Sequence, residues 1–292
     1  MYKRSQTTGL NTILAVKNFL NGVDRFKVVF CRDNTINNTN PKLITPITND
    51  ILVLDSSFNP PHLGHQSMLE IAPAIYNKNI DLAPGTVTTK DLSTHSGLLL
   101  LSIKNADKGD VSIEEYAERL DMMILLAQKT YLTCAVALTK ESLFINKSKL
   151  ITEWLKIESP NKHIDNYFLL GFDTITRFFD SKYYQNKSIV ESLNPFFENS
   201  HIIALLRENN SLSGMNISQQ MEYLDKIIKN QTLNGLKLPD LWNNKIIYGE
   251  CKDTWNISSS KIRQNVKNDV IDWKAMVLPE VADYIEKKGM YK

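Results

Sequence analysis

Short apolar segments alternate along this chain with longer segments that have the periodicity of helices. The apolar segments that we interpret as strands of one sheet are residues 51–54, 98–103, 131–138, 167–171, 201–206 and 245–248. Their nearly continuous apolar character is typical of strands in a parallel sheet that helices cover on both faces. We therefore predict an α/β fold: a Rossmann-like, doubly wound parallel sheet of about five to six strands with helices on both faces.

The segments between these strands predict helices. The spacing of apolar residues indicates helices at residues 62–77, 112–129, 147–157, 215–230, 259–266 and 279–287, with shorter aromatic-rich helical pieces between 174 and 197. Ser112 followed by Glu115 is the pattern of a capping box at the start of one of them. The polar segment 78–96 is predicted to be a surface loop, and His95 within it is given no functional role.

The first fifty residues differ in character from the rest of the chain. Apolar spacing over residues 8–20 predicts an amphipathic helix, Phe26–Cys31 predicts a strand, and the segment 32–49 is a loop rich in Asn, Thr and Pro. We expect residues 1–50 to form an N-terminal extension that packs against the main sheet, and residues 51–292 to form the main domain.

Composition limits the partners and compartments that we expect. The 292 residues are 42% hydrophobic and 23% charged, and the net charge of +2 gives no general reason to expect nucleic acid or a membrane surface as a partner. The three cysteines lie far apart, which argues against a disulfide framework and fits a reducing compartment. The sequence shows neither a membrane-spanning run nor a signal-peptide pattern. We expect a cytoplasmic protein, with a nuclear location also open, and the oligomeric state is left open.

One loop has the clearest chemical pattern. The apolar strand that ends at Leu54 is followed by Asp-Ser-Ser-Phe-Asn-Pro-Pro-His-Leu-Gly-His, residues 55–65, and then by a helix. A loop that opens a helix presents free backbone N–H groups and the positive end of the helix dipole, so it suits a phosphate group. His62 and His65 are three residues apart, and they share a face if the helix begins at His62. Two imidazoles in this position can donate hydrogen bonds to phosphoryl oxygens as charge develops on them.

Two other interpretations of this loop are weaker. It could be a proline-rich turn with two surface histidines and no chemical role. A metal site is disfavoured, because no carboxylate or cysteine lies at ligand spacing near the histidines.

Two further segments place polar side chains where a strand ends or a helix begins. In Gly-Phe-Asp-Thr at residues 171–174, Asp173 can either cap the following helix or accept hydrogen bonds from ribose hydroxyl groups. In Ile-Ser-Ser-Ser-Lys-Ile-Arg at residues 257–263, three hydroxyl groups lie beside the free amides of a helix start, and Arg263 can bind phosphate through two hydrogen bonds. An ordinary serine N-cap with solvated charges would also account for this second segment.

Together these segments resemble the signatures of one family. Ser-Phe-Asn-Pro-Pro-His-Leu-Gly-His at residues 57–65 resembles the signature of the HIGH-superfamily nucleotidyltransferases, and its first four residues are typical of nicotinamide mononucleotide adenylyltransferases. The segment 169–178 resembles the part of that family that holds the nucleotide, and the segment 257–263 resembles its ATP-phosphate cradle. The tail 277–285 looks like the family's closing helix. The resemblance covers about residues 50–292 and looks closest to a divergent fungal branch, the promoter-of-filamentation proteins, which share Asp-Ser-Ser-Phe-Asn-Pro-Pro-His, Gly-Phe-Asp-Thr and Ser-Ser-Ser-x-Ile-Arg.

The resemblance implies an adenylyltransferase. AMP would move from ATP to nicotinamide mononucleotide, giving NAD and pyrophosphate, through in-line attack of the mononucleotide phosphate on the α-phosphorus, with no general base and no covalent intermediate. Mg²⁺ would accompany ATP, bound mainly by the substrate and water, and no metal site made of side chains is predicted. Residues 51–292 would then be a nucleotidyltransferase domain.

The same resemblance implies roles for individual residues. The predicted catalytic residues are His65 and His62, in contact with the reacting phosphates. The predicted ATP-binding residues are Ser57, Phe58, His62, His65, Gly171, Asp173, Ile257, Ser258, Ser259, Ser260 and Arg263. The predicted acceptor-binding residues are Ser56, Ser57, Asn59, Lys108, Tyr183, Tyr184 and Arg207.

The chain departs from the family pattern on the acceptor side. Ser56 replaces the usual glycine, and Lys140 and the pair Tyr183-Tyr184 stand where the family has tryptophans that stack on the nicotinamide ring. Two alternatives therefore stay open: a nucleotidyltransferase with another phosphorylated acceptor, such as a pantetheine phosphate, or a regulatory protein that binds or hydrolyses ATP. A class I aminoacyl-tRNA synthetase, which shares the His-Leu-Gly-His element, is disfavoured because the chain is short and nearly neutral.

Overall fold

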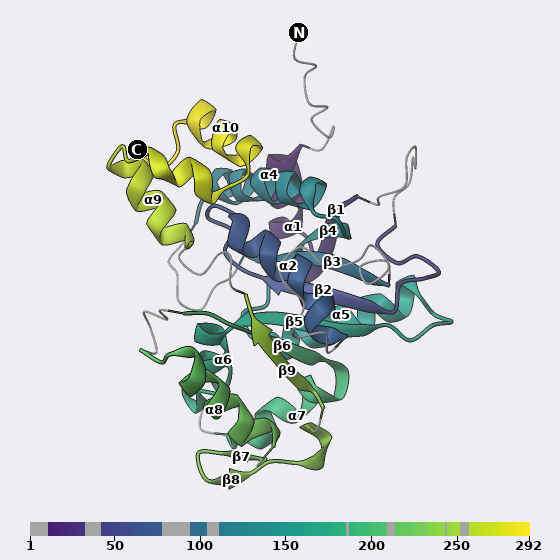
Figure 1. Cartoon of the computed structure of the whole chain (residues 1–292). Coiled ribbons are helices and arrows are strands. Elements are labelled where there is room, and N and C mark those ends of the chain that lie inside the picture. Colours follow the sequence, from purple (N-terminus) through teal and green to yellow (C-terminus); the bar gives the residue numbers. More distant parts are fainter. Residues whose placement is uncertain are drawn as a thin grey trace.

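A seven-stranded sheet forms the centre of the molecule (Figure 1). The computed structural model describes residues 11–32, 42–77, 94–103, 111–184, 187–208, 214–229, 231–242, 244–251 and 257–292. The strands of this sheet are β1 (Phe26–Arg32), β2 (Asp50–Asp55), β3 (His95–Ser102), β4 (Thr133–Thr139), β5 (Asp165–Gly171), β6 (His201–Leu206) and β9 (Ile246–Glu250). A separate two-stranded ribbon consists of β7 (Thr232–Leu233) and β8 (Leu236–Lys237).

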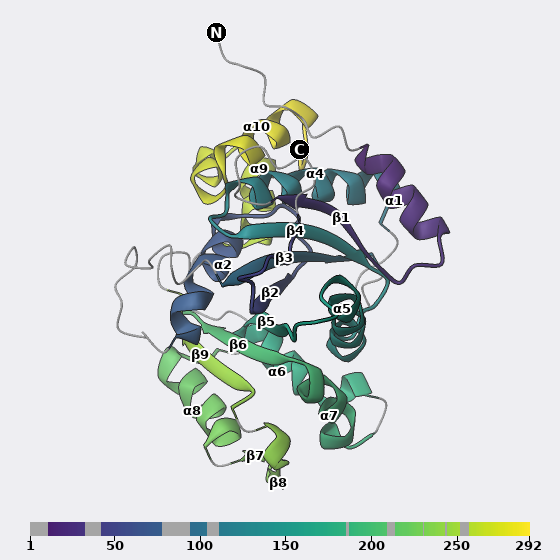
Figure 2. The same ribbon diagram turned by 90° about the vertical axis from the view of Figure 1, so that its right-hand side faces the viewer.

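The strand order confirms the predicted doubly wound class. The order is β1-β4-β3-β2-β5-β6-β9, and every neighbouring pair from β4 to β9 is parallel. The chain runs outward from β2 to β4 and then returns to continue from β5 to β9, so the order reverses between β2 and β5 (Figure 2). The sheet has more strands than the predicted five to six because β1, expected in the extension, pairs antiparallel with β4.

Helices cover both faces of the sheet. The α-helices are α1 (Thr12–Asn21), α2 (Leu63–Tyr76), α4 (Ile113–Lys129), α5 (Phe144–Glu158), α6 (Phe172–Phe178), α7 (Ile189–Asn199), α8 (Ile217–Ile228), α9 (Ser259–Lys267) and α10 (Pro279–Lys288). Short 3-10 helices are η1 (Ser181–Tyr184), η2 (Asp240–Trp242) and η4 (Ile271–Met276). Figure 2 shows α2 on one side of the strands and α5 and α7 on the other.

Alternate residues of each strand enter two different cores. Ile51 and Val53 of β2 pack with α5, α6, α7 and α8, whereas Leu52 and Leu54 pack with α1, α2 and α4. Because successive side chains of a strand point to opposite faces, a strand buried on both faces must be apolar at nearly every position. That requirement explains the continuous apolar segments in the sequence.

The N-terminal helix and strand are part of this fold. Val16 and Phe19 of α1 are fully buried against the α4 side of the sheet. The ammonium group of Lys140 donates hydrogen bonds to the carbonyl oxygens of Leu20 (3.2 Å) and Gly22 (2.6 Å), which neutralises the negative end of α1. Lys140, directly after β4, therefore lies at the C-terminal end of α1.

The C-terminal segment forms a third, smaller core. Ile262 of α9, Trp273 of η4 and Ile285 of α10 pack together against Met122 of α4. The hydroxyl group of Tyr284 donates to Asp121 at 2.7 Å, which ties α10 to the same helix. Figure 1 shows α9 and α10 gathered beside α4.

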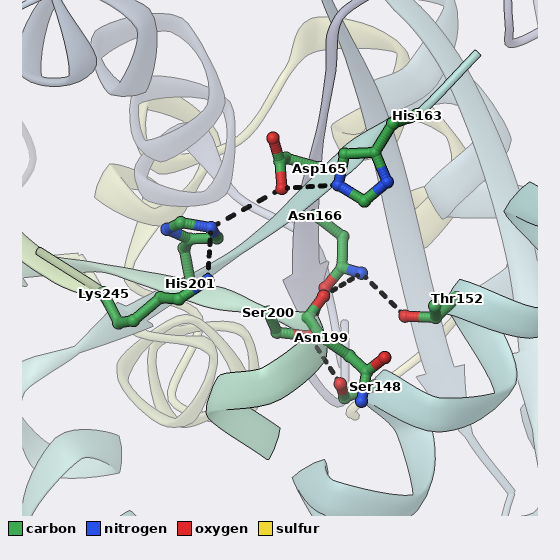
Figure 3. A network of polar contacts seen from close by, with 9 residues as sticks. All are labelled: Ser148, Thr152, His163, Asp165, Asn166, Asn199, Ser200, His201 and Lys245. Carbon is green, nitrogen blue, oxygen red and sulfur yellow. Dashed lines mark hydrogen bonds and ion pairs between the residues drawn. The ribbon is translucent and has the colours of Figure 1, made fainter. Parts of the chain in front are cut away.

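Polar side chains contact one another at the edge of the sheet where the parallel strands β5, β6 and β9 begin (Figure 3). Asp165, at the start of β5, contacts His163 (3.2 Å) and His201 (3.6 Å), and His201 contacts the ammonium group of Lys245 (3.1 Å). At the same edge, buried His95 lies 3.5 Å from Asp50. The prediction of a surface loop was wrong for His95 and Ser96, which begin β3, while residues 78–93 lie outside the described parts.

None of the helices in the described ranges combines the length and apolar character that a bilayer span requires.

Candidate functional site

The predicted phosphate-binding loop follows β2 and ends at the first turn of α2. Phe58 has a positive φ of 44°, and its side chain is fully buried against the ring of His65 at a centroid distance of 4.9 Å. His62 is the N-cap residue of α2, with extended backbone angles, and its N–H donates to Nδ1 of His65 at 3.1 Å. The loop therefore fixes both histidines at the mouth of the helix, as the sequence predicted.

The contacts of His65 determine which ring nitrogen holds its proton. Nδ1 accepts from the backbone of His62, so the proton of the neutral ring lies on Nε2, which can donate to the hydroxyl oxygen of Ser56 at 3.0 Å. The ring of His62 is 3.8 Å from that of His65, and its buried Nδ1 has no hydrogen-bond partner. His62 thus keeps hydrogen-bonding capacity for a ligand.

Burial keeps both rings neutral. Desolvation lowers the pKa of His62 from 6.5 to about 3, with a further contribution from the positive charge of Arg207. Desolvation also lowers the pKa of His65 well below 6.5, and the neighbouring His62 adds to the effect. Near neutral pH the pair acts as hydrogen-bond donors and acceptors without charge.

The start of α9 meets the same loop. Ser258 caps α9 by accepting from the N–H of Lys261, and the hydroxyl group of Ser259 donates to the carbonyl oxygen of Pro60 at 2.8 Å. The guanidinium of Arg263 donates to the carbonyl oxygen of Asn59 at 2.6 Å and lies 3.4 Å from the hydroxyl oxygen of Ser260. We call this meeting of the two helix starts the α2–α9 junction. Two positive dipole ends and a guanidinium converge there, which favours a polyanion.

Asn59 is held at this junction by the end of the chain. The hydroxyl group of Tyr291 donates to Oδ1 of Asn59 at 2.6 Å, and Nδ2 of Asn59 donates to Glu115 at 3.4 Å. Glu115 in turn forms an ion pair with the buried Arg119. The side chain of Asn59 is therefore occupied by protein contacts in this structure.

A small cavity of about 70 Å³ opens beside His62, at the point where the strand order reverses. It is lined by His62, Gly64, Met68, Gly171, Leu205, Leu206, Arg207, Cys251 and Ile257. Ligands of doubly wound sheets bind outside the carboxyl ends of strands at such a switch point. Gly171, Ile257 and His62, three of the predicted ATP-binding residues, come together here.

Arg207, which lines this cavity, forms an ion pair with Asp173. Gly171, rather than Asp173, is the N-cap residue of α6, so capping does not explain Asp173. Oδ1 of Asp173 and Nε of Arg207 are buried without hydrogen-bond partners in the described structure, so both can bond to a ligand. The buried Gln220 holds Arg207 by accepting from its N–H (3.3 Å) and donating to its carbonyl oxygen (2.8 Å). Arg207, predicted on the acceptor side, thus lies with the predicted ATP-binding residues.

A larger cavity of about 220 Å³ lies on the other side of the loop, and we call it the aromatic cavity. Its lining residues are Asp55, Ser56, Ser57, Ser102, Val111, Tyr116, Arg119, Ser142, Leu143, Phe144, Lys147, Thr174, Arg177, Phe178, Tyr183 and Tyr184. Four of the predicted acceptor-binding residues, Ser56, Ser57, Tyr183 and Tyr184, line it. The hydroxyl group of buried Tyr184 donates to the carbonyl oxygen of Phe178 at 2.7 Å, which fixes that ring in the wall.

A buried ion pair forms part of the wall of the aromatic cavity. The ammonium group of Lys147 on α5 contacts Oδ2 of Asp55 at the end of β2, and the exposed fractions of the two side chains are 4% and 8%. Ser102 donates to the other carboxylate oxygen of Asp55 at 3.4 Å. The ammonium group also lies 4.9 Å from the centre of the Phe144 ring.

The predicted site residues therefore fall into three neighbouring places. The α2–α9 junction and the small cavity contain most of the predicted catalytic and ATP-binding residues, with Asp173 held beside the small cavity by Arg207. The exceptions are Ser57, which lines the aromatic cavity, and Phe58, whose ring supports His65 from the buried side. The aromatic cavity contains most of the predicted acceptor-binding residues. Lys108 lies outside the described residues, and Lys140 lies at the end of α1 instead. In the described parts of the chain, no group of three or more His, Cys, Asp or Glu side chains is placed to hold a metal ion.

Sequence reasoning missed several residues of these cavities. Lys147 was given no role, although it lies four residues before Ile151 and eight before Leu155, both buried on α5. A lysine on the apolar face of a helix was the signal that could have found it. Arg177 was given no role either, although it lies in the segment 169–178 that resembles the family. Gln220, which holds the backbone of Arg207, had no such signal, because polar residues on helices are ordinarily solvated.

Comparisons with known proteins give one relative of substantial identity. A Schizosaccharomyces pombe protein, provisionally named a nicotinamide mononucleotide adenylyltransferase, is 34% identical over 235 residues, which are 79% of this chain and 81% of the relative. No family model matches the chain.

Solved structures are similar at lower identity. The nicotinic acid mononucleotide adenylyltransferase of Plasmodium falciparum, complexed with APC, is 18% identical with a TM-score of 0.45 and covers 83% of this chain and 97% of its own. The same enzyme complexed with NaAD is 17% identical with a TM-score of 0.45. A Vibrio parahaemolyticus protein, provisionally named a nicotinate-nucleotide adenylyltransferase, is 15% identical with a TM-score of 0.40, over 84% of this chain and 96% of its own.

Proposed function

This chain belongs to the nicotinamide mononucleotide adenylyltransferase family and is a nucleotidyltransferase, and from that premise we propose that it transfers AMP from ATP to nicotinamide mononucleotide. The products would be NAD and pyrophosphate. The observation that carries the proposal is the α2–α9 junction, where two helix starts and Arg263 meet beside a neutral histidine pair. A triphosphate is the ligand that this combination suits best.

We assign ATP to the junction and the small cavity. The backbone amides that begin α2 and α9, the serine hydroxyl groups of α9 and Arg263 would hold the triphosphate. The unpartnered carboxylate oxygen of Asp173 would accept a hydrogen bond from a ribose hydroxyl group, and Arg207 would keep that carboxylate oriented. The acceptor nucleotide would occupy the aromatic cavity, where Tyr183, Tyr184 and Phe144 offer rings for stacking.

The proposed reaction needs positioning more than proton transfer. A phosphate oxygen of the mononucleotide forms a bond to the α-phosphorus of ATP while the bond from that phosphorus to the bridging oxygen breaks, and pyrophosphate leaves with the bonding electrons. The attacking phosphate is already anionic, so no general base is required. His65 would exchange the Ser56 oxygen for a phosphate oxygen as its Nε2–H acceptor, and His62 would stabilise the charge that develops on the reacting phosphates.

Mg²⁺ would arrive with ATP as part of the substrate. The described residues provide no cluster of carboxylates around the junction, and Mg²⁺ ordinarily keeps phosphate and water ligands in such sites. The ion would neutralise charge on the triphosphate and on the leaving pyrophosphate.

Product analysis with a panel of acceptors tests this proposal. Purified protein is incubated with ATP and Mg²⁺ together with nicotinamide mononucleotide, nicotinate mononucleotide, pantetheine phosphate or no acceptor, and the products are separated and weighed by mass spectrometry. We expect NAD as the main product, at a rate that depends on the mononucleotide. Formation of ADP and phosphate at the same rate without any acceptor would instead support an ATP-hydrolysing regulatory protein.

A further inference from the structure

The Lys147–Asp55 pair is a buried group of opposite charges that the proposed reaction does not use. We propose that this pair selects the neutral carboxamide of nicotinamide mononucleotide over the carboxylate of nicotinate mononucleotide. The inference rests on the proposed function, since it assigns the acceptor ring to the aromatic cavity. It names the substrate class of that cavity and the residues that determine it.

The position of the pair matches the place of a ring substituent. Phe144, Tyr183 and the ion pair all line the aromatic cavity, and the Lys147 ammonium group lies 4.9 Å from the centre of the Phe144 ring. An aromatic ring that stacks on Phe144 would therefore carry its substituent within reach of both charged groups. Ser56 and Ser57, which line the same cavity, join this wall to the loop that leads to the histidine pair.

The hydrogen-bonding capacity of the pair is only partly used. The Lys147 ammonium group has three donors and contacts one oxygen of Asp55, and the carboxylate of Asp55 accepts from Lys147 and, at the long distance of 3.4 Å, from Ser102. Both side chains are more than nine-tenths buried, so water is a poor source of further partners. A ligand in the cavity can complete both sets of hydrogen bonds.

A carboxamide complements this pair and a carboxylate does not. The carboxamide has a carbonyl oxygen that can accept from Lys147 and an NH₂ group that can donate to Asp55. The nicotinate carboxylate has only acceptors, so it would place a negative charge beside Asp55 without a proton to share. Two carboxylates side by side in a buried site are strongly unfavourable. The neutral carboxamide adds no charge, so Lys147 and Asp55 still balance each other.

Substitution of each partner should move acceptor preference in opposite directions. The measured quantity is kcat/KM for nicotinamide mononucleotide divided by kcat/KM for nicotinate mononucleotide, which we call the acceptor ratio. We expect a wild-type acceptor ratio well above one. Asp55→Asn removes the repelling carboxylate and leaves the Lys147 charge free, so the ratio should fall by about tenfold or more. Lys147→Gln leaves the Asp55 charge in place, so the ratio should rise although both acceptors bind more weakly.

Asp50→Asn is the matched control. Asp50 lies at the other end of the same strand and also belongs to a buried pair, with His95, but it is remote from the cavity. The acceptor ratio of the Asp50→Asn variant should equal that of the wild type. If Asp55→Asn does not fold because one charge is left unpaired, the double variant Asp55→Asn with Lys147→Gln removes both charges, and its ratio should fall toward one.

The outcomes separate this inference from the proposed function. An acceptor ratio that stays at the wild-type value in folded Asp55→Asn or in the double variant, or a wild-type preference for nicotinate mononucleotide, would overturn the selection by the ion pair while leaving adenylyl transfer intact. A wild-type protein that forms neither dinucleotide would overturn both.

Discussion

Two neutral histidines stand where the proposed reaction places the most negative charge. Burial lowers the pKa values of His62 and His65, so neither ring carries a positive charge near neutral pH that could attract phosphate. The positive contribution of the site comes instead from helix amides and arginine, which cannot lose a proton near neutral pH. We infer that the histidines act by directed hydrogen bonds, and their chemistry can be tested separately from phosphate binding.

Replacement of His65 tests the role of the directed hydrogen bond. His65→Ala removes the Nε2–H donor, and loss of one preorganised donor to developing charge should lower kcat by about a hundredfold or more. Turnover is measured at saturating ATP and acceptor. His163→Ala is the control, because His163 is a largely exposed histidine at the opposite edge of the sheet. Unchanged kcat with a lowered melting temperature would show that His65 is structural.

The depressed pKa of His62 predicts an acid-sensitive fold. Its pKa is about 3 in the folded chain and about 6.5 when unfolded, so between these values the unfolded chain binds a proton that the folded chain refuses. Stability should therefore fall as pH falls, by about 2 kcal/mol between about pH 7 and about pH 5 for this residue alone. Asn at position 62 can still cap α2 and does not titrate.

The comparison of wild type with His62→Asn isolates this effect. Urea unfolding of both proteins across the pH range cancels the contribution of other groups, including Asp50, whose raised pKa of about 6 acts in the opposite direction. The difference in unfolding free energy between the two proteins should shift by about 2 kcal/mol over that interval. A constant difference would mean that His62 titrates normally in the folded protein.

Single residues were predictable from the sequence where a motif surrounds them. The histidine pair and the serines of α9 lie at the helix starts that the pattern indicated. Asp173 and Arg207 were both predicted as site residues, but their pairing was not, because Arg207 lies more than thirty residues away, directly after another strand. The Asp55–Lys147 pair joins residues 92 positions apart, and local patterns contain no information on such a contact.

At the level of elements, the site is a junction of two helix starts held by short contacts. Arg263 and Ser259 reach from α9 to the carbonyl oxygens of Asn59 and Pro60, so the two dipoles are kept at a fixed separation. The sequence predicted both helix starts and their phosphate-binding character. Their meeting could not be predicted, because it depends on the packing of α9 against the third core.

Arg263 links the two helices and should also bind phosphate. Arg263→Ala removes the guanidinium, so the affinity for ATP should fall by about tenfold while the affinity for the mononucleotide changes less. Calorimetric titration of each ligand measures both constants. Lys267→Ala in the last turn of α9 is the control, since it removes a positive charge from the same helix at the end remote from the junction. An ATP affinity equal in wild type and Arg263→Ala would remove this residue from the site.

The N-terminal elements should contribute to stability as part of the main fold. Phe19 of α1 is 1% exposed against the α4 side of the sheet, whereas Leu14 of the same helix is 50% exposed. Phe19→Ala should lower the free energy of unfolding by about 3 kcal/mol because it leaves a cavity, and Leu14→Ala should change it by less than about 0.5 kcal/mol. Denaturant unfolding measures both. Equal, small effects would mean that α1 is dispensable for the stability of the sheet.

Over the whole molecule, the doubly wound topology brings the chemistry to one edge of the sheet. The strand order reverses between β2 and β5, and the loop after β2, the start of α6 after β5 and the end of β6 all meet at that carboxyl edge. The alternation of strands and helices in the sequence was enough to predict this class, since apolar strands must be covered on both faces. The antiparallel direction of β1 was not predictable, because an apolar pattern does not encode strand direction.

The C-terminal residues also meet the site through this topology. Tyr291, next to the last residue, fixes Asn59 of the loop, and the third core carries α9 to the same place. The proposed function therefore depends on elements from β2 through to the C-terminal residues. The most direct test of the proposed function follows the AMP group as it moves from ATP to the acceptor.

The most direct measurement follows the phosphorus atoms of ATP. Purified wild-type protein is incubated with nicotinamide mononucleotide and Mg²⁺, in one reaction with ATP radiolabelled at the α-phosphorus and in a parallel reaction with the label at the γ-phosphorus. In-line adenylyl transfer predicts that the α-label appears in NAD and the γ-label in pyrophosphate, in equal amounts and at equal rates. Recovery of the γ-label as inorganic phosphate, with the α-label retained in ADP and none in NAD, would contradict the account.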